Sequence, residues 1–108
     1  MYCEHLKGLR YEQIVLSYYL DKNWILLGQR IKTPFAEVDL LLKQGKLLKL
    51  IEVKSLGNEA FMNYRIRQRQ KERLIKAGQF LHFKWKMDVE LEIVFVDNQE
   101  ELTIIPLD

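Results

Sequence analysis

The stretch EVDLLLKQGKLLKLIEVKS, residues 37–55, joins two apolar runs through a short turn and carries charged residues near both of its ends. Glycine at the first position of a two-residue loop suits the type II′ turn of a β-hairpin, and Gly45-Lys46 provides such a loop. In that register the numbers of paired residues sum to 91, which puts Asp39 directly opposite Glu52. Directly opposed residues share one face of a hairpin. The predicted polar face carries Glu37, Asp39, Glu52 and Lys54, and the predicted core face carries Val38, Leu40, Ile51 and Val53.

Two opposed carboxylates on the polar face need an explanation. Their Cβ atoms would lie about 5 Å apart, and like charges at that separation destabilise a hairpin. A divalent cation would offset the repulsion, and Mg²⁺ favours one or two carboxylates together with water and phosphate oxygens. An ion pair between Lys54 and Glu37 would relieve part of it without a metal. Both explanations are open from the hairpin alone.

The sequence on either side of the hairpin predicts a small α/β domain. Apolar residues recur at helical spacing in two segments, and apolar or alternating runs predict strands elsewhere. The predicted order is α-β-β-β-α-β-β, which indicates a mixed central sheet flanked by helices in a single domain, residues 1–108. The predicted helices are residues 5–22 and about 64–85, and the predicted strands are residues 24–32, 37–43, 47–54, 89–96 and 102–105, the last ending before Pro106.

Composition excludes several classes of protein. A chain of 108 residues is one domain at most. No stretch approaches the roughly 20 apolar residues of a membrane span. The N-terminal residues lack the apolar segment of a signal peptide, and the single cysteine, Cys3, has no internal disulfide partner. We therefore expect a cytoplasmic protein without a membrane partner.

The net charge of +2 is unevenly distributed along the chain. Residues 64–86 contain eight basic residues and one acid, a charge of +7, which leaves −5 for the rest of the chain. A basic segment on an acidic body suggests a surface for a polyanion. The alternative is a solvated helix face that binds nothing.

Both predicted helices carry polar residues in line with their apolar stripes. Glu12 lies three residues after Leu9 and four before Leu16, so it should face inward from the first helix. Gln68 and Lys71 continue the stripe of the second helix and should face inward at its start, where they would orient phosphate. The structural alternatives are a Glu bonded to backbone and a lysine whose stem covers the core. The basic residues beside this stripe or away from it are Arg65, Arg69 and Arg73.

These residues resemble the restriction-endonuclease-like, or PD-(D/E)xK, nuclease superfamily. That superfamily presents an Asp on one strand and (D/E)-x-K on the next, as Asp39 and Glu52-Val53-Lys54 do here. More closely, the chain is similar to the YraN-like family of small predicted endonucleases, which is related in fold to archaeal Holliday-junction resolvases. The similarity extends over most of the chain and includes Gly8 to Glu12, AEVDLLL (36–42), LIEVKS (50–55), KERLIKAGQFL (71–81) and MDVELEIVFV (87–96).

The resemblance implies a metal-dependent DNA endonuclease. Asp39 and Glu52, with the Val53 carbonyl, would hold Mg²⁺ or Mn²⁺, and Glu12 would join them directly or through water. Such an ion lowers the pKa of a bound water and stabilises charge on the phosphate. Lys54 would position this water or the developing oxyanion. The residues predicted to contact DNA phosphates are Gln68, Lys71, Arg65, Arg69 and Arg73.

The predicted substrate is DNA of a particular structure. No element that reads base edges is identifiable in the sequence, so we expect branched or otherwise structured DNA to be selected rather than a base sequence.

Two other functions are compatible with the sequence. One is a nucleic-acid-binding module on a nuclease fold whose catalysis is weak or lost, although such a module has no physical reason to keep two repelling carboxylates. The other is a structural or interaction domain, in which QFLHFKWK, residues 79–86, could form a homodimer surface. We expect Phe80, Leu81 and Phe83 to pack in the core instead.

Overall fold

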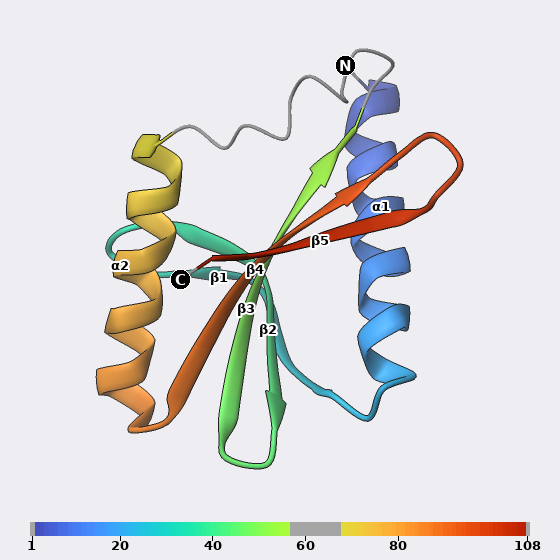
Figure 1. Ribbon diagram of the computed structural model, residues 1–108. Helices are drawn as coiled ribbons and strands as arrows, with labels where there is room; N and C mark the ends of the chain where they lie inside the picture. The colour runs from blue at the N-terminus through green and yellow to red at the C-terminus, as the bar shows by residue number, and fades with distance from the viewer. Residues whose placement is uncertain (1, 57–67, 108) are drawn as a thin grey trace.

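The computed structural model describes residues 2–56 and 68–107, and of residues 2–5 only the backbone. Within these residues two helices and five strands follow one another in the predicted order (Figure 1). The elements are α1 (Tyr2–Leu20), β1 (Ile25–Lys32), β2 (Glu37–Gln44), β3 (Leu47–Ser55), α2 (Gln68–Trp85), β4 (Asp88–Val96) and β5 (Leu102–Leu107).

The strands form one mixed sheet with the order β1-β2-β3-β4-β5. Strands β3 and β4 are parallel, and the other neighbouring strands are antiparallel. Adjacent residues of β2 pack under different helices: Leu40 lies in a cluster with Val15 of α1, and Leu41 lies in a cluster with Ala77 of α2. Because successive side chains of a strand point to opposite faces, α1 and α2 cover opposite faces of the sheet (Figure 1). The predicted α/β fold is confirmed.

Helix α1 ends two residues earlier than predicted, because the chain adopts a left-handed conformation after it. Asn23 has a φ of 69°, which asparagine tolerates better than most residues. The amide of Asn23 donates to the Leu20 carbonyl at 3.0 Å, and the amide of Trp24 donates to the Tyr19 carbonyl at 3.1 Å. Trp24 then packs in the core, and β1 starts at Ile25, one residue later than predicted.

The hairpin of β2 and β3 has the predicted register. Paired residues run from Gln44↔Leu47 to Leu40↔Ile51, and the numbers of each pair sum to 91. Gly45 has a φ of 60°, as the first loop position of a type II′ turn requires. The turn therefore fixes which residues of the two strands lie opposite each other.

The ladder between β2 and β3 ends before it reaches the acidic residues. Its last pair is Leu40↔Ile51, so the expected pairing of Asp39 with Glu52 is not part of the ladder that the structure describes. The ladder therefore stops directly beside Asp39 on β2 and Glu52 on β3.

The alternation of side chains along β2 breaks at the same place. Val38 packs with Leu41 in the cluster under α2, whereas Leu40 packs under α1. The prediction that Val38 shares the core face of Leu40 is therefore wrong. The physical reason is an irregular backbone: Asp39 lies between Val38 and Leu40, and its neighbour on β1, Arg30, has a φ of 50°.

Strand β5 includes the proline at which the prediction ended it. Pro106 pairs with Glu92 of β4, and the strand continues to Leu107. Proline cannot donate a hydrogen bond, but an edge strand needs donors on one side only, and β5 is the edge strand beside β4.

Helix α2 ends at Trp85 as predicted, whereas its predicted residues 64–67 lie outside the described part of the chain. Leu81 is buried and Phe80 is half-buried, but Phe83 is 78 % exposed, so the core position predicted for Phe83 is wrong. Phe83 lies two residues after Leu81, which places it on the far side of the helix. Within the described residues, neither helix has the length and apolar character needed to cross a membrane.

The turn gives a first prediction. Replacing Gly45 by Ala should destabilise the protein by about 1–2 kcal/mol, because a side chain at positive φ is strained, although an added Cβ meets no atom within 4 Å. Lys46→Ala is the matched control and should be nearly neutral. Urea unfolding of the two variants and the parent measures the difference. Equal stability of the two variants would contradict the assigned turn.

Candidate functional site

Asp39 lies where the β2–β3 ladder ends, and its carboxylate replaces a backbone acceptor there. The Val53 amide of β3 donates a hydrogen bond to Asp39 Oδ2 at 2.8 Å. This bond uses one of the two carboxylate oxygens and holds the side chain against the backbone of β3, next to Glu52. The register of the hairpin and the loss of pairing together bring the two acids to one place.

Glu52 points from β3 toward α2 and is only partly paired. Gln70 Nε2 of α2 donates to Glu52 Oε2 at 3.2 Å, and Lys54 Nζ lies 3.5 Å from the same oxygen. The other oxygen, Oε1, is buried and has no hydrogen-bond partner among the described residues. Burying a carboxylate oxygen without a partner among these residues is costly.

The carboxylates of the site act on one another. Burial, and after it the charge of Asp39, raises the pKa of Glu52 from 4.5 to about 8, while Lys54 opposes the shift. Burial and then Asp39 also raise the pKa of Glu12, and Arg30 opposes that shift. Asp39 is therefore the charge that links Glu52 on one side with Glu12 on the other.

Glu12 faces inward from α1 as predicted, with 15 % of its side chain exposed. Its partner is a side chain and not the backbone, because Arg30 Nη2 of β1 lies 2.8 Å from Glu12 Oε1. Sequence reasoning missed Arg30. Pairing of β1 with β2 is the feature that identifies Arg30 as a site residue. Arg30 lies beside Asp39, between the pairs Gln29↔Leu40 and Ile31↔Val38.

Lys54 pairs with Glu52 and not with Glu37. The structure records the ion pair of Lys54 with Glu52, and Glu37 is exposed at the start of β2. The alternative offered by the sequence, a Lys54–Glu37 ion pair, is therefore not the contact that forms. The side chain of Lys54 is 35 % exposed, so its ammonium lies at the border of the buried acid and solvent.

Gln70, and not Gln68, is the glutamine of α2 that reaches the acids. Gln68 is exposed and donates to Glu72 at 3.3 Å, so the expectation that Gln68 faces inward is wrong. Helical spacing explains why Gln70 faces the acids. Gln70 lies four residues before the buried Leu74 and seven before the buried Ala77, on the stripe that faces the sheet.

The remaining predicted residues are only partly placed. Lys71 is half-buried, and Arg69 and Arg73 are exposed on α2. Arg65 lies outside the described residues. The structure fixes the amide of Val53 through Asp39, and the role of its carbonyl remains a prediction.

The donor set of this site fits a hard divalent cation. Within residues 2–56 and 68–107, no three Asp, Glu, His or Cys side chains come together as a preformed metal cage. Mg²⁺ uses one or two carboxylates and completes its shell with water and phosphate oxygens. The pair of Asp39 and Glu52, with Glu52 Oε1 buried and unpaired within these same residues, has the oxygens that such an ion needs. Glu12 is engaged by Arg30 and would contribute through water.

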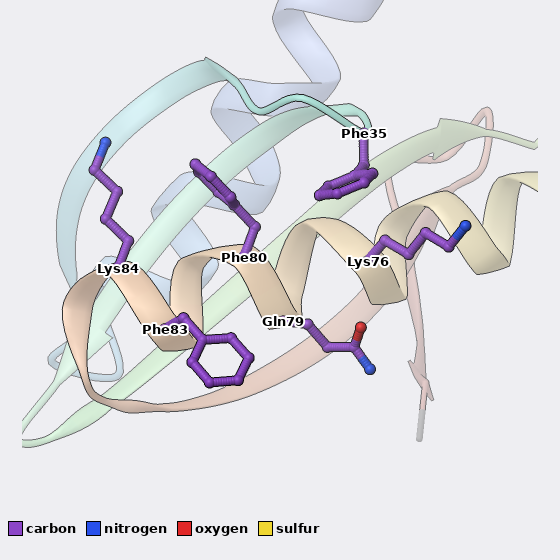
Figure 2. A pocket seen from close by; sticks show the side chains of 6 residues that line it. All are labelled: Phe35, Lys76, Gln79, Phe80, Phe83 and Lys84. Atoms are coloured by element: carbon purple, nitrogen blue, oxygen red, sulfur yellow. The ribbon is translucent and has the colours of Figure 1, made fainter.

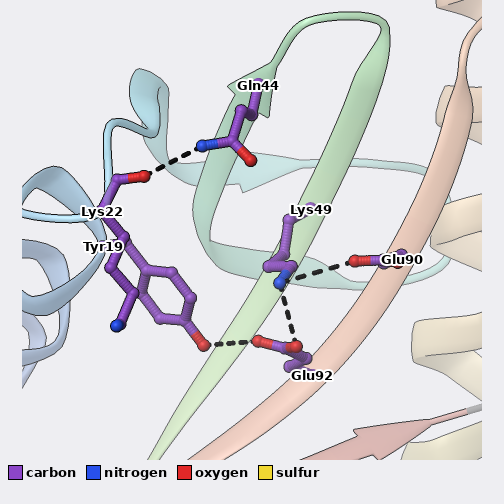
Figure 3. Close-up of polar contacts among 6 residues, drawn as sticks. All are labelled: Tyr19, Lys22, Gln44, Lys49, Glu90 and Glu92. Atoms are coloured by element: carbon purple, nitrogen blue, oxygen red, sulfur yellow. Dashed lines mark hydrogen bonds and ion pairs between the residues drawn. The ribbon is translucent and has the colours of Figure 1, made fainter.

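In a second charged cluster, the buried lysine is paired with carboxylates of the neighbouring strand. Lys49 of β3, on the face covered by α1, lies 3.0 Å from Glu92 and 3.4 Å from Glu90 (Figure 3). Tyr19 donates to Glu92, and Lys49 lies 4.5 Å from the ring centre of Trp24. The sequence signal was the alternation Leu47, Lys49, Ile51, which places Lys49 inward. Its charge is balanced within the fold, so this cluster is structural.

The sequence matches the profile of the uncharacterised protein family UPF0102 over residues 11–96, a range that includes Glu12, Asp39, Glu52 and Gln70. The chain belongs to this family. UPF0102 contains the YraN-like proteins that the sequence resembles. The match establishes the family.

Three relatives show how far the similarity to UPF0102 proteins extends. The protein of Petrotoga mobilis is 26% identical over 106 residues, which cover 93% of this chain and 94% of the relative. The protein of Parvibaculum lavamentivorans is 30% identical over 94 residues, with 82% and 70% covered. The protein of Erythrobacter litoralis is 35% identical over 69 residues, with 64% and 60% covered. Their names give the family and no activity.

The raised pKa of Glu52 predicts how stability depends on pH. Between 4.5 and about 8 the folded state holds a proton on Glu52 that the unfolded state has released. The free energy of unfolding should therefore fall as pH rises through this range in EDTA. Glu52→Gln removes this loss and should be more stable than the parent above pH 8, by roughly 3 kcal/mol, with the difference vanishing at low pH.

Thermal unfolding across that pH range measures the effect. Asp21→Asn removes an exposed carboxylate at the end of α1 and should follow the parent at every pH. A parent whose stability stays level or rises between pH 4.5 and 8 would contradict the buried, repelled state of Glu52.

Proposed function

We propose that this protein is a metal-dependent endonuclease that hydrolyses phosphodiester bonds in DNA and selects its substrate by structure. The observation that carries the proposal is the buried Oε1 of Glu52, which has no hydrogen-bond partner in the described part of the chain and lies beside the carboxylate of Asp39. Two acids that repel each other in a partly buried site are stabilised by a cation, and phosphate oxygens complete the shell of Mg²⁺ or Mn²⁺.

The chain's own residues have separate tasks in this proposal. Asp39 and Glu52 would hold the cation, with the Val53 carbonyl as a third oxygen, and Glu12 would act through water. When bound, the cation supplies the positive charge that activates water and stabilises the phosphate. Lys54, 3.5 Å from Glu52, would orient the attacking water and hold charge on the phosphate. Gln70 would keep Glu52 Oε2 in place through its bond of 3.2 Å.

The basic face of α2 supports DNA as the substrate. Arg69 and Arg73 are exposed on the helix whose start contacts Glu52 through Gln70. Positive charge beside a carboxylate site offsets the repulsion between its acids and the phosphates of DNA. Lys71 is half-buried on the same helix turn and is proposed to contact a phosphate near the scissile bond. Because Gln68 is exposed, we propose that it contacts a phosphate further from the scissile bond.

A second candidate is a nucleic-acid-binding module that has lost catalysis. The exposed Arg69 and Arg73 would serve it equally well. A binding module does not explain why an oxygen of Glu52 is buried beside Asp39, so we rank this function second. Incubation with a panel of branched and linear DNAs in Mg²⁺, Mn²⁺ or EDTA separates the two functions, because cleavage in either metal and none in EDTA belongs to the nuclease alone.

The decisive variants change charge at nearly constant size. Glu52→Gln should lower cleavage by at least about 100-fold, because one of two anionic metal ligands is gone. Its binding to DNA in EDTA should hold or improve, since a negative charge near phosphate has been removed. Lys54→Met should also stop cleavage but should weaken binding, because it removes a positive charge. Gel assays of cleavage and fluorescence anisotropy of binding measure the two effects.

Asp21→Asn is again the matched control. Asp21 is exposed at the end of α1, next to Lys22, whose carbonyl accepts from Gln44 at the hairpin turn. It therefore lies at the opposite end of β2 from Asp39 and should leave cleavage unchanged. If Glu52→Gln and Lys54→Met cleave like the parent, the activity resides elsewhere. If the parent binds DNA tightly and cleaves no member of the panel, the binding module is the better account.

A further inference from the structure

A hollow of about 610 Å³ lies against the exposed side of α2, away from the carboxylates. Its volume lies within the range of about 300–1,000 Å³ typical of ligand pockets. Figure 2 shows the ring of Phe35, from the β1–β2 connection, and the ring of Phe80 on the same side of the helix. The lining side chains are Phe35, Lys76, Gln79, Phe80, Phe83 and Lys84.

The aromatic rings of this hollow are exposed to an unusual degree. Phe83 is 78 % exposed and Phe35 is 43 % exposed. Phe35 and Phe80 lie edge to face with centroids 6.4 Å apart, and Lys84 lies 5.9 Å from the ring centre of Phe80. Exposed apolar rings grouped beside polar residues mark interaction sites on protein surfaces.

The charge of the hollow is of one sign. Lys76 and Lys84 lie at its two ends, and none of its six described lining residues is acidic. The single acid of α2, Glu72, accepts a hydrogen bond from Gln68. A polyanion with flat apolar rings matches this surface, because its phosphates would meet the lysines and its bases would stack on phenylalanine.

A second copy of the chain is a poorer match. In a two-fold dimer the same surface meets itself, so Lys76 and Lys84 of each copy would face a surface that carries only positive charge.

The hollow continues the basic surface that starts beside the carboxylate site. Arg69, Arg73, Lys76, Phe80 and Lys84 follow each other at spacings of three and four residues, so they lie along one side of α2. Gln70, which contacts Glu52, lies at the start of the helix. With a rise of about 1.5 Å per residue, the hollow extends from about 9 Å to about 21 Å beyond Gln70 along the helix axis.

We propose that this hollow binds a single-stranded stretch of DNA, whose bases stack on Phe83 and Phe35 while Lys76 and Lys84 hold its phosphates. As a substrate site this inference rests on the proposed nuclease function, for which it narrows the substrate to DNA with a single-stranded arm. Stacking on phenylalanine does not depend on the identity of the base, which agrees with selection by structure.

The test compares two probes with equal charge. One is a fluorescent oligothymidylate of about 16 nucleotides, the upper end of the length that a small single-strand-binding domain covers. The other is an abasic oligomer with the same number of phosphates. In EDTA the parent should bind the oligothymidylate about tenfold more tightly than the abasic oligomer, as expected for one or two stacked bases. A parent without this preference overturns the proposal.

Variants separate stacking from a general loss of apolar surface. Phe83→Ser should reduce the preference for bases, because Phe35 alone remains to stack, and Phe83→Trp should keep it. Ile25→Ser is the matched control, because Ile25 is 59 % exposed on β1, outside the hollow, and it should keep the preference. Lys76→Ala should weaken binding of both probes by a similar factor. An unchanged preference in Phe83→Ser contradicts the proposal.

Light scattering on the parent and on Phe83→Ser tests whether a second copy of the chain occupies the hollow instead of DNA. If the parent is a dimer and the variant a monomer, the hollow is a contact between two copies and the proposal is overturned. Because binding is measured in EDTA, its outcome does not depend on cleavage. A parent that prefers bases but cleaves no DNA defeats the proposed nuclease and leaves the single-strand surface standing, whereas a parent that cleaves DNA without that preference defeats only this inference.

Discussion

The hydrogen bond from the Val53 amide to Asp39 Oδ2, 2.8 Å long, is the contact on which the site depends. It forms where the β2–β3 ladder has ended at Leu40↔Ile51, so a side chain satisfies a backbone donor that the neighbouring strand no longer serves. The bond keeps a carboxylate beside Glu52 in spite of their repulsion. The consequence is an acid whose pKa is raised to about 8 and whose Oε1 has no partner within the described chain.

The two charged clusters on β3 show that burial of charge alone does not identify a functional site. Lys49 is 8 % exposed, yet two glutamates and two aromatic rings surround it, so the cluster stabilises the sheet against α1. Glu52 lies three residues further along the strand and faces the other helix, with an acid as its neighbour and one oxygen that no described residue pairs. The difference lies in whether the fold itself supplies the compensating charge, and among residues 2–56 and 68–107 the cation paired with Glu52 is Lys54, at 3.5 Å.

The sequence was sufficient for the fold and for the register of the hairpin, because both depend on local rules. Helical and strand periodicity gave the order of the elements, and a glycine in a two-residue turn gave the pairing that sums to 91. These local rules do not predict where the β2–β3 ladder ends. The end of the ladder depends on the irregular backbone at Arg30 and on the capture of the Val53 amide by Asp39, which are contacts between distant residues.

The errors on α2 have a different cause. The predicted stripe of Leu74, Ile75, Gly78 and Leu81 is largely correct, since three of these four residues are buried, but its extension to Gln68 is wrong. Ala77 is the buried residue that it omits, and the spacing from Ala77 through Leu74 leads to Gln70. Phe83 was assigned to the core from its hydrophobicity, and its exposure reveals a surface instead. A helix phase is set by what the helix packs on, and this helix packs on a sheet whose twist a single sequence does not show.

The proposed function requires that Asp39 and Glu52 share one divalent cation. Crystals of the protein soaked in Mn²⁺ test it most directly, since the anomalous signal of manganese locates the ion without reference to activity. We expect an ion about 2.1 Å from an oxygen of each carboxylate, the distance typical of a small hard cation, and no ion at this place in crystals of Glu52→Gln. Manganese bound only elsewhere, with Glu52 Oε1 still unpaired in saturating metal, would contradict it.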